Sequence, residues 1–396
     1  MDYITIAQAA SNWGVSSRRV YKYLEDNRIE GAVRYGAAWL IPQNAEKPGD
    51  PRKIMKTSQH DLRDDLSLAI GQTFHPVPRD DPYKLMNSIT DETLRLLPEA
   101  LIAYMKGDFE RVIYSYDKSE GNGAAKLILS MGAIPAAISL GDYSLYLEVE
   151  KWLKSIAKPG QDAGVAAYAE LALATGYVGA SALSMVPEWL KIGDLTELHP
   201  LVRYEANVKR AEYYKCLKKY DSMLDIAQTT LSLLGTMSSC NQFSSTEINL
   251  LIRCAMACHC LGRDDEAKRW LMGAMRLALP HGFITPFAET ITTLGGLTEV
   301  CLKEAFPKWH DAVLEQGTRT IRNWVTFHNR FTKDNISIIL TVQETHVASL
   351  AARKIPRAEI ARRLHYSEGW VNKTIADIYE KLMVNNRDEL ANYILP

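Results

Sequence analysis

Between Leu85 and Val325 the apolar residues recur with the helical period, and one turn signal separates the amphipathic segments more than once. Gly107-Asp108-Phe109 and Gly141-Asp142-Tyr143 lie 34 residues apart, and each stands between two helical patterns. The series continues at looser intervals with Gly176-Tyr177, Lys219-Tyr220-Asp221 and Gly262-Arg263-Asp264. Because a helix pair cannot bury its apolar face alone, the pattern predicts about five pairs stacked into one curved array.

This spacing resembles that of tetratricopeptide repeats. The resemblance implies a mainly α-helical solenoid over residues 85–325, whose concave surface receives an effector or a protein partner. The prolines and charges of residues 46–84 predict a linker, in which Leu62, Leu66 and Ile70 could form one short helix. We expect a second linker at residues 326–339.

The segment from Leu340 to Leu395 carries the start and stop signals of several short helices. Thr341 and Glu344 form a capping box, Pro356 suits the first position of a second helix, and Ser367 can cap a third. The third helix has an apolar stripe of Val371, Ile375, Ile378 and Leu382. On or near the opposite face are Gly369, Asn372, Lys373, Ala376 and Asp377.

This whole segment resembles the LuxR-type DNA-binding domain, in which four helices include a helix-turn-helix. The resemblance implies that the third helix enters the major groove and that Asn372 and Lys373 contact bases. Arg357 suits a phosphate, and the expected DNA-binding set is Arg357, Ser367, Trp370, Asn372, Lys373 and Ala376. Family members pair through the last helix, here near Asp388 to Ile394, so we expect a homodimer.

Three departures from the family pattern put the base preference in doubt. Trp370 replaces a small Thr, Thr374 replaces a His, and Pro356 replaces a capping Ser. The Trp370 ring could contact a sugar or a thymine methyl, or it could be buried against its own domain.

The N-terminal segment, Tyr3 to Pro42, predicts two helices followed by an extended pair. Thr5 and Gln8 form a capping box for the first helix, and Ser16 can cap the second, in which Val20 and Leu24 point inward. The extended residues 29–35 and 39–41 surround Gly36 and predict a hairpin.

This order of elements resembles the winged helix-turn-helix of MerR and excisionase proteins. The resemblance implies DNA contacts from the second helix and from the wing tip. The expected residues are Ser17, Arg18, Tyr21, Lys22, Arg34 and Tyr35.

The charge of both ends is close to neutral. Residues 1–53 have eight Lys or Arg against six Asp or Glu, and residues 340–396 have eight against seven. Two alternatives to a regulator remain open, and the weak phosphate attraction, together with Trp370, supports the first of them. One is a scaffold that binds protein and not DNA, and the other is an architectural protein, because excisionase-like heads also bend DNA.

Composition and motifs point away from membranes and catalysis. The chain has a net charge of -1, no basic and apolar leader, and no run of about 20 apolar residues, so we expect a cytoplasmic protein. The LuxR resemblance implies a bacterial one. Cys254, Cys258 and Cys260 are the only cysteine cluster, and we interpret them as packing residues without a metal. No P-loop, H-E-x-x-H, G-x-S-x-G or dinucleotide motif occurs, so we expect neither an enzyme nor a cofactor.

The stretch CLGRDDEAKRWLMGAMRLALPHGFITPF, residues 260–287, resembles the end of the sensor region in MalT-like LuxR regulators. Those regulators usually carry an ATPase before the solenoid, and this chain has the winged segment there instead. The combined resemblances imply a sequence-specific transcriptional regulator. Its middle domain would sense a small molecule or partner and control DNA binding or dimerisation without ATP.

Overall fold

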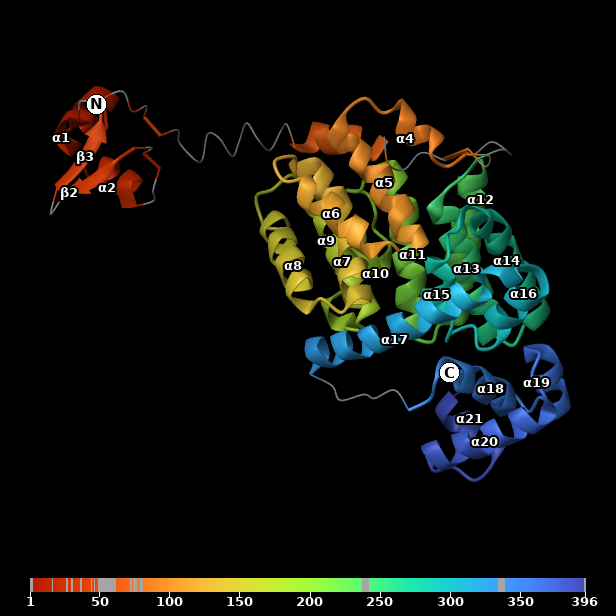
Figure 1. Cartoon of the computed structure of the whole chain (residues 1–396). Helices are drawn as coiled ribbons and strands as arrows, with labels where there is room; N and C mark the ends of the chain where they lie inside the picture. Colours follow the sequence, from red (N-terminus) through yellow and green to blue (C-terminus); the bar gives the residue numbers. More distant parts are fainter. Residues whose placement is uncertain are drawn as a thin grey trace. The chain divides into compact units, whose positions relative to one another are not determined.

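The computed structural model describes residues 3–15, 17–25, 28–29, 31–35, 38–43, 45, 47–48, 62–71, 73, 77–78, 81–236, 242–333 and 339–394 (Figure 1). The chain divides into two compact units, residues 1–61 and 62–396, and each has a buried core of its own. The protein is mainly α-helical, as the periodicity predicts, and its described strands are short.

The first unit contains two helices and a small antiparallel sheet. Its elements are β1 (Tyr3–Ile4), α1 (Ile6–Trp13), α2 (Ser17–Glu25), β2 (Val33–Tyr35) and β3 (Ala38–Pro42). β3 lies between the other two strands, with Ile4 opposite Ile41 and Arg34 opposite Trp39. The predicted hairpin is therefore confirmed as β2 and β3. β1 is an additional strand, which is too short to show any alternation in the sequence.

The capping box predicted at the start of α1 is also confirmed. The Gln8 amide donates to Thr5 Oγ1 (3.3 Å), and the Thr5 amide donates to Gln8 Oε1 (2.9 Å). Val20 and Leu24 of α2 are buried, as predicted, with Ile41 of β3 in the same core. Ser16 lies outside the described residues.

The second unit begins inside the segment predicted to be a linker. Residues 62–71 are helical, and Leu66 and Ile70 are buried in the core that they share with Leu127 and Ile134. β4 (Val77–Pro78) pairs antiparallel with β5 (Gln242–Phe243), and α4 (Lys84–Ser88) follows. The structure thus places residues 62–84 in the helical unit, because an apolar i, i+4 stripe buries surface despite the neighbouring prolines.

The central helices follow one another as hairpins. They are α5 (Glu92–Lys106), α6 (Phe109–Lys118), α7 (Gly123–Leu140), α8 (Tyr143–Ile156), α9 (Ala163–Gly179), α10 (Glu188–Ile192), α11 (Pro200–Cys216), α12 (Tyr220–Gly235), α13 (Ser245–Cys260) and α14 (Asp264–Ala278). Gly107 and Gly141 end α5 and α7 with φ of 85° and 75°, a conformation that glycine adopts without steric cost. Asp108 and Asp142 cap α6 and α8, which confirms both predicted turns.

One predicted turn is wrong. Gly176 and Tyr177 lie inside α9, and the helix continues to Gly179. A Cβ on Gly176 would meet Tyr146 at 3.0 Å and Ile134 at 3.2 Å. The glycine therefore serves close packing of α9 on α7 and α8, and it does not mark a chain reversal.

Three further helices complete this region: α15 (Thr285–Thr290), α16 (Leu297–Ala305) and α17 (His310–Thr332). α17 contacts the C-terminal ends of two earlier helices. Asn323 Nδ2 donates to the Ser139 carbonyl (2.7 Å), and Trp324 Nε1 donates to the Gly179 carbonyl (2.6 Å). These carbonyls lie in last turns that lack intrahelical donors, so α17 satisfies them. The helix runs to residue 332, beyond the predicted start of a linker at residue 326.

The last four helices share one core. They are α18 (Val342–Ala352), α19 (Arg357–Leu364), α20 (Glu368–Leu382) and α21 (Arg387–Ile394). The Thr341 and Glu344 capping box is confirmed, and Ser367 caps α20 by accepting from the Trp370 amide (3.2 Å). Pro356 precedes α19 with ψ of 145°, so it is the N-cap and not the first helical residue.

α7 is long and apolar enough to cross a membrane by length and composition. Its apolar window is 67% buried, as in the core helix of a folded domain. Cys254 and Cys258 are buried free thiols, and burial raises the pKa of Cys254 to about 12, where the nucleophilic thiolate is scarce. No cluster of metal-ligating side chains occurs among the described residues.

Candidate functional site

The outward face of α20 is polar and accessible. Asn372, Lys373 and Ala376 are exposed, whereas Val371 and Ile375 are buried against α18 and α19. The sequence-predicted face is therefore the accessible one. An asparagine and a lysine in adjacent positions can hydrogen bond to adenine and guanine edges in a major groove.

Trp370 lies beside this face and packs on its own domain. Its ring centroid is 4.0 Å from that of Tyr366, with 31° between the planes, and its side chain is half-buried. The sequence left open whether the Trp370 ring contacts DNA or is buried against its own domain. The structure shows it packed on its own domain. The tryptophan fixes the start of α20 to the turn that precedes it.

The cations near α19 differ in their availability. Arg357 is exposed at the first position of the helix. Glu359 accepts from Arg362 Nε (2.7 Å) and from Arg363 Nε (2.6 Å), which partly neutralises both. Arg357 is thus the better placed of these three for a phosphate contact.

In the first unit, α2 exposes Ser17, Tyr21 and Lys22 on one side. Arg34 is exposed on β2, and its guanidinium carbon lies 5.9 Å from the centroid of the Trp39 ring on the paired strand. This cation–π contact holds Arg34 along the strand. Arg18 lies in α2 and Tyr35 in β2, but their side chains are outside the described part of the structure.

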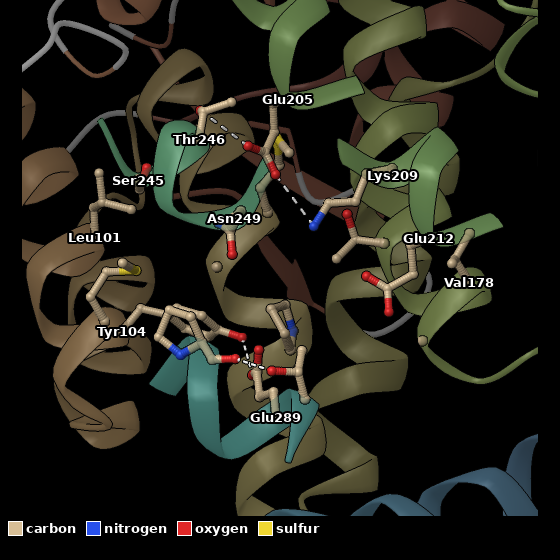
Figure 2. Close-up of a pocket in the computed structure, with 18 of the residues that line it drawn as sticks. Leu101, Tyr104, Val178, Glu205, Lys209, Glu212, Ser245, Thr246, Asn249 and Glu289 are labelled. Carbon is tan, nitrogen blue, oxygen red and sulfur yellow. Dashed lines mark hydrogen bonds and ion pairs between the residues drawn. The ribbon is translucent and has the colours of Figure 1, made fainter. Parts of the chain in front are cut away.

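A large cavity lies among the central helices (Figure 2). Its volume is about 840 Å³, and its wall draws residues from α5, α7, α9, α11, α13, α15 and α17. Charged side chains of α11 and α13 reach this wall, and Glu289 of α15 reaches it beside Tyr104 of α5. The volume falls within the range of small-molecule pockets.

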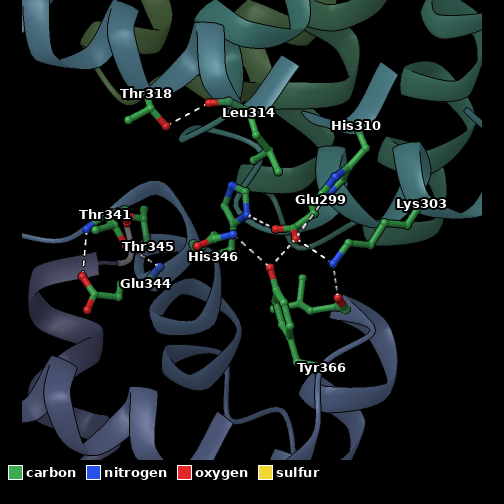
Figure 3. A network of polar contacts seen from close by, with 12 residues as sticks. Glu299, Lys303, His310, Leu314, Thr318, Thr341, Glu344, Thr345, His346 and Tyr366 are labelled. Atoms are coloured by element: carbon green, nitrogen blue, oxygen red, sulfur yellow. Dashed lines mark hydrogen bonds and ion pairs between the residues drawn. The ribbon is translucent and has the colours of Figure 1, made fainter. Parts of the chain in front are cut away.

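A buried network joins α16 and α17 to the C-terminal helices (Figure 3). The Glu299 carboxylate, whose side chain is 0% exposed, lies at its centre. His346 Nδ1 is 2.6 Å from Glu299 Oε2, and the Tyr366 hydroxyl donates to Oε1 (2.8 Å). Lys303 Nζ lies 2.9 Å from Oε1 and also donates to the Leu364 carbonyl (2.5 Å). We call Glu299, Lys303, His346 and Tyr366 the joint.

A second contact strengthens this attachment. Arg353, at the end of α18, donates to Asp264 Oδ1 (2.9 Å) and to the His259 carbonyl (2.7 Å). Gly296 also packs closely on α19, because a Cβ on it would meet Leu364 Cδ2 at 2.8 Å. The C-terminal helices are therefore held through α18 and α19, while the polar face of α20 stays exposed.

The joint keeps the Glu299 carboxylate ionised although its side chain is fully buried. Burial opposes the ionisation of Glu299, but hydrogen bonds from His346, Lys303 and Tyr366 and the charge of His346 outweigh it. The pKa of Glu299 falls to about 2 as a result. Burial, followed by the charge of Glu299, raises the pKa of Tyr366, so its hydroxyl remains a donor.

No family model matches the chain, and neither a curated protein nor a solved structure is significantly similar to it.

The joint is the feature that the sequence did not predict. Tyr366 lies in the turn before α20 and His346 lies in α18, and neither position in the sequence indicates a buried contact. The one available signal was Glu299, a charged residue one turn before Leu302 on the buried side of α16. A single buried acid does not indicate which residues it contacts. Here they are His346 and Tyr366, 47 and 67 residues further along the chain.

Proposed function

We propose that the protein is a sequence-specific DNA-binding transcriptional regulator. The observation that carries this proposal is the exposed face of α20, where Asn372, Lys373 and Ala376 follow the capped turn at Ser367. α19, the turn and α20 would form a LuxR-type helix-turn-helix, with α20 in the major groove and Arg357 on a phosphate. Trp370 would support this arrangement from inside, by its packing on Tyr366.

The first unit would supply a second DNA contact of the winged helix-turn-helix kind. Two short helices and the antiparallel β2–β3 hairpin, with polar residues exposed on α2, support this assignment. In this proposal α2 is the reading helix and the hairpin is the wing, so Lys22 and Arg34 lie on DNA-facing surfaces.

The central helices would be a tetratricopeptide-like sensor. Successive helix hairpins and the cavity of about 840 Å³ support this role. An effector that binds more tightly to one arrangement of the helices would shift the population of that arrangement, and with it DNA binding or dimerisation.

Selection of genomic DNA fragments by the full-length protein tests the proposal. At near-physiological salt we expect an enriched motif with two dissimilar parts, one for each DNA-binding region. Lys373→Ala should weaken binding to one part by roughly 1 to 3 kcal/mol, because it removes a base contact. Arg18→Ala should weaken binding to the other part by a similar amount.

Lys158→Ala is the matched control for Lys373→Ala, because it removes the same charge from an exposed position after α8. It should leave the selected motif and the affinity unchanged. If wild-type protein enriches no motif even at low salt, the proposal is rejected.

The near-neutral ends favour a second candidate, a scaffold whose central helices bind another protein. Salt dependence separates the two, because a scaffold has no phosphate contacts to lose as salt rises. An architectural protein would bend DNA and depend on salt, without changing transcription of adjacent genes.

A further inference from the structure

We propose that the cavity among the central helices binds an organic amine, with its ammonium group on the Glu289 carboxylate beside the ring of Tyr104. The inference rests on the proposed sensor role and names the chemical class of the effector. It follows from the cavity's size, from the pairing of its charges and from the surroundings of Glu289.

Most of the charges on the cavity wall are already compensated. Glu205 and Lys209 of α11 are 3.4 Å apart. Glu212, one turn further along the same face, is paired with Lys215 (3.0 Å) and with Arg253 of α13. Figure 2 shows the pair of Glu205 and Lys209 on the wall. Glu212 has two cations beside it, so one positive charge is in excess at that point.

Glu289 is the exception. Its carboxylate accepts a hydrogen bond from the Tyr104 hydroxyl, and no ion pair joins it to a cation among the residues that the structure describes. Burial raises the pKa of Glu289 above its ordinary value, although the hydrogen bond from Tyr104 and the charges of Lys209 and Arg253 lower it. A cation in contact with the carboxylate would favour its ionised form, so the site favours a positively charged ligand.

The surroundings of Glu289 select an organic cation over a metal ion. Calcium and magnesium need six or more oxygen ligands at short range, whereas Glu289 has one phenol beside it in a space of about 840 Å³. The Tyr104 ring packs edge-on against Phe109, with centroids 5.6 Å apart, so its position is fixed. A fixed aromatic ring next to a carboxylate is the arrangement that ammonium groups prefer.

The rest of the wall suits the body of such a molecule. Leu101, Val178 and Ile321 provide apolar surface, and Thr246 and Asn249 of α13 add polar groups to the wall (Figure 2). A ligand with an amine at one end and an apolar or aromatic body would occupy both regions. At Glu289 itself an anion is disfavoured, because it would meet the carboxylate.

Calorimetric titration of the full chain with three indole compounds of matched size tests the proposal. Tryptamine carries the amine, tryptophol is its neutral alcohol, and indole-3-propionate is an anion. At neutral pH we expect tryptamine to bind about tenfold more tightly than tryptophol, which is the effect of one hydrogen bond to a charged group. Indole-3-propionate should bind more weakly than both.

Glu289→Gln keeps the size of the side chain and removes its charge. It should weaken tryptamine binding about tenfold and leave tryptophol binding unchanged. Tyr104→Phe keeps the ring, so tryptamine binding should persist. Glu110→Gln, on the exposed face of α6, is the control and should bind all three compounds as wild type does.

The proposal is overturned if tryptamine does not bind, if tryptophol binds as tightly, or if Glu289→Gln retains the tryptamine affinity. Melting temperatures of the variants separate a lost contact from lost folding. Fragment selection without any amine reports on DNA binding alone. A DNA motif without amine binding rejects only the cavity assignment, and amine binding without a DNA motif rejects only the regulator.

Discussion

At the scale of single residues, Glu299 is the group that Lys303, His346 and Tyr366 all contact. Glu299→Gln would leave Lys303 and His346 facing a neutral amide in a buried site. We expect it to lower the free energy of unfolding by roughly 3 kcal/mol, as when one partner of a buried ion pair is removed. Urea denaturation of the full chain measures this loss. Glu315→Gln, exposed on α17, is the control and should change stability little.

Low pH should lower the stability of the folded chain through Glu299 as well. The pKa of Glu299 is about 2 in the folded chain against an ordinary value of 4.5, so its ionised form stabilises the folded state. That contribution is complete above pH 4.5 and is lost as the pH falls towards 2. Wild-type protein should therefore lose stability more steeply than Glu299→Gln across this interval. Urea midpoints at several pH values measure the two slopes, and parallel slopes would place the acid sensitivity elsewhere.

At the scale of elements, two glycines of α9 provide a matched pair. A Cβ on Gly176 would press on Tyr146 of α8, whereas nothing lies within 4 Å of a Cβ on Gly179. We expect Gly176→Ala to destabilise the chain by about 1 to 3 kcal/mol through overpacking. Gly179→Ala should be neutral or stabilise by up to about 1 kcal/mol, because alanine favours helix. Thermal unfolding compares them, and equal effects would contradict the packing role of Gly176.

The elements that the sequence predicted well are those with local causes. The capping boxes at Thr5 and Thr341 and the turns at Gly107 and Gly141 depend on residues within a few positions of one another. The turn predicted at Gly176 failed because a glycine in a helix that packs closely on its neighbours looks the same in sequence as a glycine in a turn.

In the candidate site, too, features with local causes could be predicted and features that depend on tertiary contacts could not. The exposure of Asn372 and Lys373 follows from the helical period of α20, and it could be predicted from its own residues. The packing of Trp370 on Tyr366 and the pairing of Glu299 with His346 could not be predicted. Both depend on tertiary contacts, and the second joins residues that are distant in sequence.

At the scale of the whole molecule, the chain has two units with separate cores. Each unit can therefore lose its structure without exposing the core of the other. We expect the fragment of residues 62–396 to unfold at the same urea midpoint as the corresponding transition in the full chain. Near-ultraviolet circular dichroism of both proteins measures this, and a lower midpoint for the fragment would show that the first unit stabilises the second.

α17 touches both the cavity and the joint. Ile321 and Trp324 line the cavity, and His310 at the other end lies 3.5 Å from Glu299. The axial distance from His310 to Ile321 is about 16 Å at the ordinary helical rise. An α-helix is stiff over this length, and α17 is held both at its middle, beside the cavity, and at His310, beside Glu299. If the cavity binds a ligand as proposed, a force on the middle of α17 would reach Glu299 through His310, and through Glu299 the C-terminal helices.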